Sequence, residues 1–457
     1  MTIFNTMSMQ KEVFEPIKPG LARIYVCGPT AYDFAHIGNA RPAVVFDTLR
    51  RWLVFRGFEV EMAQNITDID DKIISRANQE NLSAQDVAKK YIAEYFRDME
   101  GLNIPPANFH PQVTGEMPEI VAMIGELADN GWAYTYNGSV FFRASKLEEY
   151  GKLAKKNIED LQMGIRVEVD GQKEHPADFV LWKPAKPGEP AWDAPWGAGR
   201  PGWHIECSAM ARKYLGATVD IHGGGEDLCF PHHENEAAQS LAANGVPLAN
   251  FWMHNGMITV DAKKMSKSIG NFFTIREICE KYDYSVLRFL ILSVHYRSPL
   301  SFSEELLESS KAGLARIRNC RRSIDETSGG EGGDCAEFKQ FNSDFAAAMD
   351  DDLNTANAIA AVFDLVKFVN KNLGASRSFL DAAATELDFM LDILGIEFAD
   401  SSTDSQISET DIAELIEERN GAKAARDFAR ADEIRAQLDL AGIVIKDTRE
   451  GTLWHRS

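Results

Sequence analysis

The fold is decided by residues 25–41, which read YVCGPTAYDFAHIGNAR. The stretch Arg23–Val26 is rich in β-formers, and Gly28-Pro29 ends the expected strand. A helix is expected to open at His36 and to run through Leu53, because apolar residues recur there at helical spacing. This corner would present backbone N–H groups and a helix dipole to a phosphate. It matches neither G-x-G-x-x-G nor a P-loop, so an ordinary corner with a solvent-facing histidine is an alternative.

The composition is that of an ordinary globular protein. Of 457 residues, 45% are hydrophobic and 26% are charged, which suggests a packed core divided among roughly three domains. The formal net charge of −21 argues against general binding to nucleic acid or to an anionic membrane, but not against a local basic surface. We see no secretory signal and no apolar run of membrane-spanning length, so a cytoplasmic protein is expected. The six cysteines are scattered, which favours thiols or metal ligands over a disulfide framework.

Further helices and strands are expected along the chain. A second strand covers 59–65 and leads into the acidic run NITDIDDK at 65–72, which could bind a cation or a ligand amine, or simply cap a helix. Asn137-Gly138 is typical of a hairpin turn. The Pro- and Trp-rich stretch 183–203 is expected to be a long structured loop. Helices are expected over 111–129, 146–160, 338–394 and 411–441, linkers over 325–337 and 399–410, and a small β-forming tail over 442–454.

Three stretches rich in metal-binding side chains follow that loop. They read WHIECS (203–208), DIHGGGED (220–227) and PHHENE (231–236). His232 and Glu236 stand four residues apart on an expected helix and so share one face. With Cys27 and Cys207, each at the edge of an expected strand, they form an S, S, N, O donor set that suits Zn²⁺. The spacing leaves other sets open, with His233, His222 or Cys229, as well as buried thiols without a metal.

A lysine motif, KKMSKSIGN at residues 263–271, follows the expected strand 257–260. Lysines flanked by serines and ending in Gly-Asn form a flexible cationic loop. Such a loop can clamp a triphosphate and stabilise the charge that develops as pyrophosphate leaves. Taken alone, the motif could equally be a solvated surface loop.

Together these motifs resemble those of the class I aminoacyl-tRNA synthetases. HIGN at residues 36–39 resembles the HIGH motif of that class with Asn in the last place, and KMSKS at 264–268 matches in full. Within the class, the sequence is most similar to the cysteinyl-tRNA synthetases. The resemblance spans the whole chain and is carried by residues 25–41, 65–74, 179–183, 202–210, 220–236, 264–273 and 295–298.

The resemblance implies an α/β fold. It consists of a Rossmann-type (HUP) parallel-sheet catalytic domain with an insertion, followed by an α-helical bundle and a small C-terminal α/β anticodon-binding domain. The expected boundaries are 1–110 and 201–262 for the split catalytic domain, 111–200 for the connective insertion, 263–310 for the KMSKS loop and stem-contact region, 311–398 for the bundle and 411–457 for the C-terminal domain.

The resemblance also implies the reaction. The carboxylate of L-cysteine would attack the α-phosphate of ATP, giving cysteinyl-adenylate and pyrophosphate, and the cysteinyl group would pass to the terminal ribose hydroxyl of tRNA(Cys). Neither step needs a protein nucleophile, so positioning and electrostatics would supply the catalysis. Mg²⁺ would accompany ATP. One Zn²⁺ per chain would select the substrate thiolate, because apolar contacts separate such similar amino acids by only ~1–3 kcal/mol.

Site residues follow from the resemblance in the same way. The zinc ligands fall on Cys27, Cys207, His232 and Glu236, which leaves His233 as a neighbour. Catalysis falls on His36, Asn39, Lys264 and Lys267. ATP would be bound by His36, Gly38, Asn39, Gly224, Asp227 and Lys267, and glycines 223–225 would let the backbone approach it. Cysteine would be bound by Cys27, Gly28, Thr67 and Trp203. The amide of Asn39 can donate to a phosphate but cannot carry the charge of an imidazolium.

Contacts to tRNA must be local on so acidic a chain. Two basic stretches are candidates, and a salt-bridged surface is the alternative for both; they are Lys311, Arg316, Arg318, Arg321 and Arg322, and Lys423, Arg426, Arg430 and Arg435. The competing enzyme is a cysteine ligase of the mycothiol pathway, which uses the same adenylate chemistry but would not need the region after Asp411. A non-catalytic relative that binds tRNA or senses cysteine is a further alternative. A monomer is expected.

Overall fold

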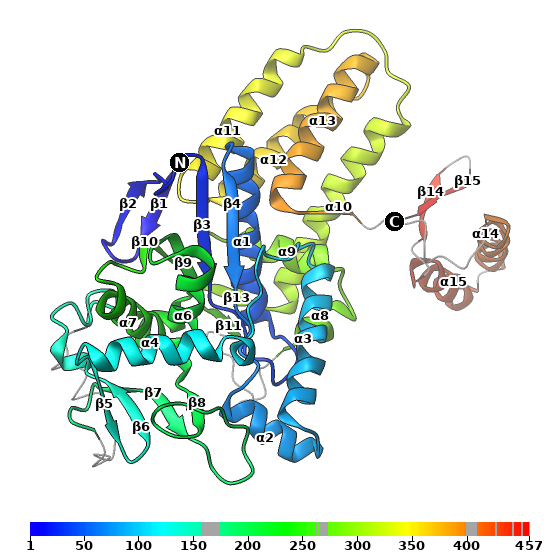
Figure 1. The fold of residues 1–457 in the computed structure, drawn as a ribbon. Helices are drawn as coiled ribbons and strands as arrows, with labels where there is room; N and C mark the ends of the chain where they lie inside the picture. Colours follow the sequence, from blue (N-terminus) through cyan, green and yellow to red (C-terminus); the bar gives the residue numbers. More distant parts are fainter. Residues whose placement is uncertain are drawn as a thin grey trace. The chain divides into compact units, whose positions relative to one another are not determined.

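The computed structural model describes residues 1–156, 173–260, 263–264, 273–398, 409–425, 427–440, 443–448 and 451–456. The chain divides into two compact units, Met1–Glu397 and Phe398–Ser457 (Figure 1). Among the helices of these described ranges, none is long and apolar enough to cross a membrane.

A four-stranded parallel sheet forms the centre of the first unit. Its order is β10-β9-β3-β4, and its strands are β3 (Leu21–Val26), β4 (Glu59–Gln64), β9 (Val219–Gly225) and β10 (Ala249–Asn255). In the chain, α1 (Ile37–Phe55) connects β3 to β4, and α6 (Trp203–Leu215) and α7 (Glu234–Asn244) lie on either side of β9. Strands of a parallel sheet are buried on both faces and read as apolar runs, as β3 does. The predicted parallel α/β fold is confirmed.

The segment between β4 and α6 in the chain contains residues 111–200, which are predicted to form an insertion. It begins with α2 (Asp71–Glu80), α3 (Ala84–Gly101) and α4 (Met117–Asp129), the last preceded by a 3-10 turn at Val113–Gly115. An antiparallel sheet follows, in the order β5-β6-β7-β8. Its strands are β5 (Ala133–Tyr136), β6 (Ser139–Phe142), β7 (Phe179–Pro184) and β8 (Gly199–Pro201). The predicted hairpin turn is confirmed, because Asn137 and Gly138 both take the positive φ that such a turn requires.

The helix predicted over 146–160 is wrong for its described residues, 146–156. A 3-10 turn at Ala144–Lys146 is followed by irregular turns. Gly151 and Lys155 take φ values of +94° and +54°, which a right-handed helix cannot contain. The carboxylate of Glu234 accepts the backbone N–H groups of Gly151 at 2.7 Å and Ala154 at 2.8 Å, so distant contacts override the local helical pattern. Residues 157–160 lie outside the described residues.

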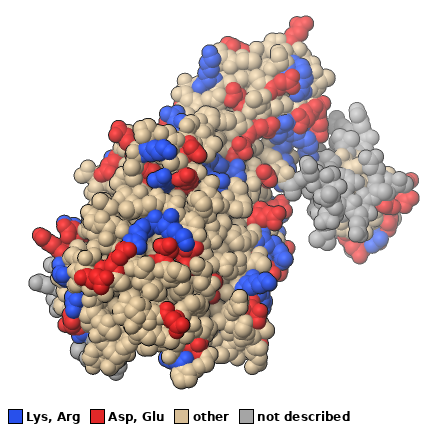
Figure 2. Space-filling view, viewed as in Figure 1, with Lys and Arg blue, Asp and Glu red and all other residues tan. Residues whose placement is uncertain are grey.

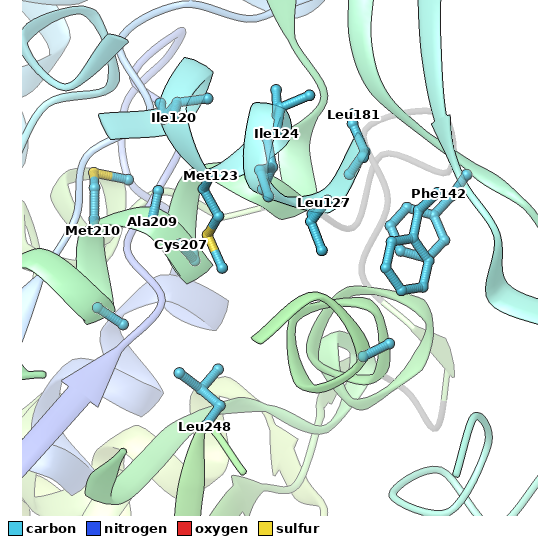
Figure 3. Close-up of a cluster of buried hydrophobic side chains, with 14 of the residues drawn as sticks. Ile120, Met123, Ile124, Leu127, Phe142, Leu181, Cys207, Ala209, Met210 and Leu248 are labelled. Atoms are coloured by element: carbon cyan, nitrogen blue, oxygen red, sulfur yellow. The ribbon is translucent and has the colours of Figure 1, made fainter. Parts of the chain in front are cut away.

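A buried apolar cluster joins the insertion to the parallel sheet (Figure 3). One face of α4 packs against side chains of α6 and of the strands β5, β6 and β7. Cys207 belongs to this cluster, so the same packing that holds α6 in place also fixes the position of this thiol. The labelled members are Ile120, Met123, Ile124, Leu127, Phe142, Leu181, Cys207, Ala209, Met210 and Leu248.

Short strands and a series of helices complete the first unit. Strands β1 (Thr2–Asn5) and β2 (Gln10–Val13) form a hairpin, and β11 (Ile258–Val260) pairs with β12 (Lys263–Lys264) and, in parallel, with β13 (Leu300–Phe302). The helices are α8 (Ile275–Cys279), α9 (Tyr284–Leu292), α10 (Glu304–Glu326), α11 (Phe338–Asp350), α12 (Thr355–Lys371) and α13 (Arg377–Leu394). The helices predicted over 338–394 are therefore confirmed.

The second unit is a small α/β body. It contains α14 (Glu409–Ala424), α15 (Phe428–Leu440) and the hairpin β14 (Ile443–Thr448) and β15 (Gly451–Arg456). Its core consists of Ile412, Ile416, Ile434, Leu438, Ile443 and Ile445. The predicted pair of helices and the β-forming tail are confirmed.

Candidate functional site

A cavity of about 310 Å³ opens at the carboxyl edge of the parallel sheet. Ligands of open α/β sheets bind in this place, because loops diverge there and helix N-termini converge. The predicted site residues that line it are Cys27, Gly28, His36, Gly38, Asn39, Trp203 and Asp227. Lys264 lies in β12, whose side chains are not described, and Lys267 lies outside the described residues.

The loop after β3 is held against the loop after β4. Gly28 donates its N–H to Oδ1 of Asn65 at 2.9 Å, and Ala31 and Thr67 are joined by an N–H···O bond of 3.0 Å. A Cβ at residue 28 would lie 1.6 Å from the carbonyl oxygen of Asn65. Only glycine therefore allows the two loops to approach this closely.

The first turn of α1 is closed by Asn39. His36 is the N-cap residue, and its backbone N–H donates to Oδ1 of Asn39 at 3.1 Å. The backbone N–H of Asn39 donates in turn to the carbonyl of His36 at 2.8 Å. Because Oδ1 is engaged in this cap, the Nδ2 group of Asn39 is the part of the amide that can donate to a ligand. The side chain thus stabilises the helix start and keeps a donor for it.

The three glycines that end β9 are crowded by protein atoms. A Cβ at Gly223 would lie 2.0 Å from the ring of Phe46 in α1, and one at Gly225 would lie 2.6 Å from Oδ1 of Asp227. One at Gly224 would lie 2.9 Å from Leu228, and Gly224 itself does not line the cavity. At Gly223 the need for glycine therefore comes from the packing of β9 against α1.

Four potential metal ligands meet at the base of this edge, and we name them the Cys27 cluster: Cys27, Cys207, His232 and Glu236. Sγ of Cys27 lies 3.7 Å from Sγ of Cys207 and 3.3 Å from Oε1 of Glu236. Nε2 of His232 lies 3.6 Å from Sγ of Cys207 and 2.9 Å from Oε1 of Glu236. The expectation that Cys207 stands at the edge of a strand is wrong, because Gly202 caps α6 and Cys207 lies in that helix.

The cluster is held by contacts outside it. Nδ1 of His232 lies 2.9 Å from Nδ1 of His204, and the exposed ring of Trp203 stacks on His232 with centroids 4.1 Å apart. A hydrogen bond to the second ring nitrogen fixes the orientation of a metal-binding histidine. His232 is therefore oriented for coordination through Nε2.

A second set of four donors overlaps the first: Cys27, His222, His233 and Glu236. Nε2 of His222 lies 3.2 Å from Oε2 of Glu236, whereas Nε2 of His233 is 4.0 Å from Oε1. Nδ1 of His233 lies 2.8 Å from Nε2 of His254. Sequence reasoning missed His254, which no motif surrounds. The parallel pairing of β10 with β9 sets His254 opposite Gly224 and so brings it next to His233.

Burial and mutual contacts move the pKa values of the cluster apart. Burial raises the pKa of the Cys27 thiol well above its usual value. Burial acts in the same sense on Cys207, but hydrogen bonds with Cys27 and His232 outweigh it and lower that pKa to about 6. Burial alone would lower the pKa of His232, but attraction to Glu236 outweighs it and raises this pKa to about 10. Burial alone would raise the pKa of Glu236, but attraction to His222 and His232 outweighs it and lowers this pKa well below its usual value. A divalent cation suits such a site, because it can replace the imidazolium proton.

Thr67 does not line the cavity. It is 1% exposed, and its hydroxyl donates to Oε2 of the buried Glu206 at 3.0 Å. Burial raises the pKa of Glu206 well above its usual value. Sequence reasoning missed this carboxyl as a partner of Thr67, since only the fold brings the two residues together.

Comparisons with known proteins agree with the fold. The family described as tRNA synthetases class I (C) catalytic domain matches residues 13–312, and the DALR domain matches 344–399. The cysteine–tRNA ligase of Lachnospira eligens is 50% identical over 475 aligned residues, and that of Clostridioides difficile is 49% identical over 465. Both alignments cover 100% of this chain and of the relative.

Solved structures resemble the chain in fold alone. A Mycobacterium tuberculosis methionyl-tRNA synthetase in complex with methionyl-adenylate has a TM-score of 0.59 at 15% identity, over 82% of this chain and 89% of that one. A LeuRS–tRNA–LeuAMS ternary complex from Agrobacterium radiobacter K84 has a TM-score of 0.58 at 11% identity, over 84% of each chain. The full-length matches at about half identity decide the family: this chain belongs to the cysteine–tRNA ligases, which are class I aminoacyl-tRNA synthetases.

Proposed function

We propose that the chain ligates L-cysteine to tRNA(Cys) at the expense of ATP, through a cysteinyl-adenylate intermediate. One observation carries the proposal. Cys27 belongs both to the buried Cys27 cluster and to the wall of the cavity into which the N-terminus of α1 opens. Selection of the amino acid and chemistry at the phosphate would then take place in one cavity.

Zinc fits the donor atoms of the Cys27 cluster. Ligand atoms of a tetrahedral site stand about 1.6 bond lengths apart, so Zn–S bonds of ~2.3 Å and Zn–N or Zn–O bonds of ~2.0 Å imply separations of roughly 3.3–3.8 Å. Three of the five distances that include a sulfur are 3.3, 3.6 and 3.7 Å, and they fall in this range. The distance from His232 to Glu236, 2.9 Å, is that of a hydrogen bond, which metal binding would replace. Bound zinc would prefer a thiolate to a hydroxyl and so distinguish cysteine from serine.

On the phosphate side, the residues would act by donating hydrogen bonds and charge. The N-terminus of α1 offers the positive end of its helix dipole to the phosphates. His36 and Nδ2 of Asn39 would donate to phosphate oxygens, with Gly38 leaving room for them. Lys264 and Lys267 would balance the charge of the departing pyrophosphate, and Mg²⁺ would bind with ATP. Asp227, and the backbone at Gly224, would hold the nucleoside.

On the amino-acid side, Cys27, Gly28 and Trp203 would surround the substrate. Thr67 stays a predicted cysteine-binding residue: its hydroxyl donates to Glu206 behind the cavity wall, so it would have to become accessible to contact the substrate. The carboxylate of cysteine would then attack the α-phosphate, and the terminal ribose hydroxyl of tRNA would attack the adenylate. No protein nucleophile is needed, so correct placement would supply most of the rate.

Contacts to tRNA would come from local basic residues. On the face drawn in Figure 2, Lys and Arg side chains are interspersed with Asp and Glu. On α10, Arg321 pairs with Asp325 at 2.5 Å and Asp388 at 2.8 Å, and on α15 Arg430 pairs with Glu418 at 2.8 Å. Phosphates would have to exchange with these carboxylates, which lowers the gain from each contact.

The identity of the acceptor separates this proposal from a cysteine ligase that acts on an amino sugar. Alignments to cysteine–tRNA ligases cover the entire chain, including the small second unit that a sugar ligase would not need. These two features favour tRNA as the acceptor.

The test measures the two half-reactions separately. Cysteine-dependent exchange of pyrophosphate into ATP should occur without tRNA, and labelled cysteine should pass to tRNA when tRNA is added. Removal of zinc with a chelator should abolish both activities, and added zinc should restore them. Exchange without transfer would contradict tRNA as the acceptor, and full activity in a zinc-free preparation would contradict the role of the Cys27 cluster.

A further inference from the structure

Arg41, the last residue of the stretch at 25–41, has a buried guanidinium that the proposed reaction does not use. The residue lies in α1 and is 1% exposed. Nη1 donates to the carbonyls of Gly256 at 2.7 Å and Met257 at 2.9 Å. Nη2 donates to three further carbonyls, those of His295 at 3.4 Å, Tyr296 at 3.2 Å and Ser298 at 2.5 Å. Among the described residues, no carboxylate forms an ion pair with it.

These five carbonyls belong to two segments that are distant in the chain. Gly256 and Met257 connect β10 to β11, and residues 295–298 connect α9 to β13. The segments also touch each other, since Gly256 donates its N–H to the carbonyl of Tyr296 at 2.8 Å. A Cβ at residue 256 would lie 2.7 Å from the carbonyl oxygen of Ser298. The planar fork of Arg41 thus joins three chain segments that are packed against one another without free space.

The segments that Arg41 joins lie at the part of the cavity where ATP is proposed to bind. Gly256, Met257 and Arg41 line the cavity together with His36 and Asn39. The chain beyond Met257 runs through β11 and β12 into the lysine motif. It returns beside the start of α1, where Ile275 donates its N–H to the carbonyl of Ala35 at 2.9 Å. The residues that precede the lysine motif are therefore fixed to α1 by Arg41. The residues that follow it are fixed by backbone hydrogen bonds to the start of α1.

We infer that Arg41 is a positioning residue for adenylate formation: it holds the segment that leads into the lysine motif at a fixed distance from the phosphate-binding turn of α1. This inference rests on the proposed function. Carbonyl dipoles surround the charge of Arg41, and the carboxylate of Glu226 attracts it without forming an ion pair, so Arg41 would also add to the positive field beneath the phosphates. The residue acts through its neighbours and does not itself need to touch the substrate.

Arg41→Lys provides the test, because it keeps the charge and loses the fork that bridges two segments. We expect the kcat of cysteine-dependent pyrophosphate exchange to fall about tenfold or more, since small displacements of reacting groups have large effects on rate. The KM for cysteine and the zinc content should stay close to those of the wild type. Transfer from preformed, enzyme-bound cysteinyl-adenylate to tRNA should also be preserved, because this step no longer involves pyrophosphate.

Two further variants keep the inference falsifiable. Gly256→Ala should reproduce the loss of exchange by pushing the bridged segments apart. Arg50→Lys is the matched control: Arg50 lies on the same helix and donates to the carbonyl of Pro106 at 2.8 Å, remote from the cavity, so both steps should be unchanged. Equal losses in exchange and transfer, or no loss in either, would overturn the role of Arg41. Absence of exchange in the wild type would instead overturn the proposed function.

Discussion

The contact between β9 and α1 gives a prediction whose size can be worked out from the structure. In Gly223→Ala, the new Cβ would lie 2.0 Å from Cζ and 2.4 Å from Cε1 of Phe46. Carbon atoms in contact stand about 3.5–4.0 Å apart, so α1 and β9 would have to separate by roughly 1.5 Å or the ring would have to leave its position. Overpacking of this kind lowers the free energy of unfolding by about 1–3 kcal/mol. Since α1 carries His36 and Asn39, pyrophosphate exchange should fall by up to ~10²-fold.

Urea unfolding and the exchange assay test this prediction together. Phe46→Leu removes the ring atoms that Gly223→Ala would meet, so the double variant should regain much of the stability and rate, with a coupling energy of about 0.5–3 kcal/mol. Gly125→Ala is the matched control, because its Cβ in α4 would meet no atom within 4 Å. It should gain up to about 1 kcal/mol and leave exchange unchanged. Wild-type behaviour of Gly223→Ala, or additive effects in the double variant, would refute the reasoning.

Three other outcomes are expected. Cys207→Ser should lower the zinc content, measured by elemental analysis, and cysteine-dependent exchange together, whereas Cys320→Ser, buried on α10 away from the cavity, should change neither. Asn39→Asp should keep the melting temperature, because its carboxylate can still accept the N–H of His36, but should slow exchange about tenfold or more by repelling phosphates. Burial lowers the pKa of His110 from 6.5, so below about pH 6.5 the unfolded chain binds a proton that the folded chain does not. The free energy of unfolding, measured in urea titrations, should therefore decrease as the pH is lowered below about 6.5. If His110→Gln showed the same pH dependence as the wild type, this assignment would be contradicted.

Features that depend on residues adjacent in the sequence were predicted from the sequence. The strand before Cys27 and the helix after His36 are specified by apolar runs and by the Gly-Pro turn between them, and the Asn137-Gly138 turn by its own backbone preference. Residues 146–156 show the limit of such patterns, because Glu234, more than 75 residues away, captures their backbone N–H groups. The role of Arg41 is equally invisible in the sequence, since all five of its acceptors are carbonyls that the fold alone brings together.

The choice of metal ligands shows the same limit in one site. Spacing along the chain cannot separate His232 from His233, since they stand four and three residues before Glu236 and would share its face of the expected helix. In space they differ: Nε2 of His232 lies 2.9 Å from Oε1 of Glu236 and that of His233 lies 4.0 Å away, while Nδ1 of His233 is engaged with His254. Only the set with His232 includes Cys207, and a second thiolate favours zinc. The preference between the two sets thus depends on Cys207, which α6 places 3.7 Å from Cys27, measured between the sulfur atoms.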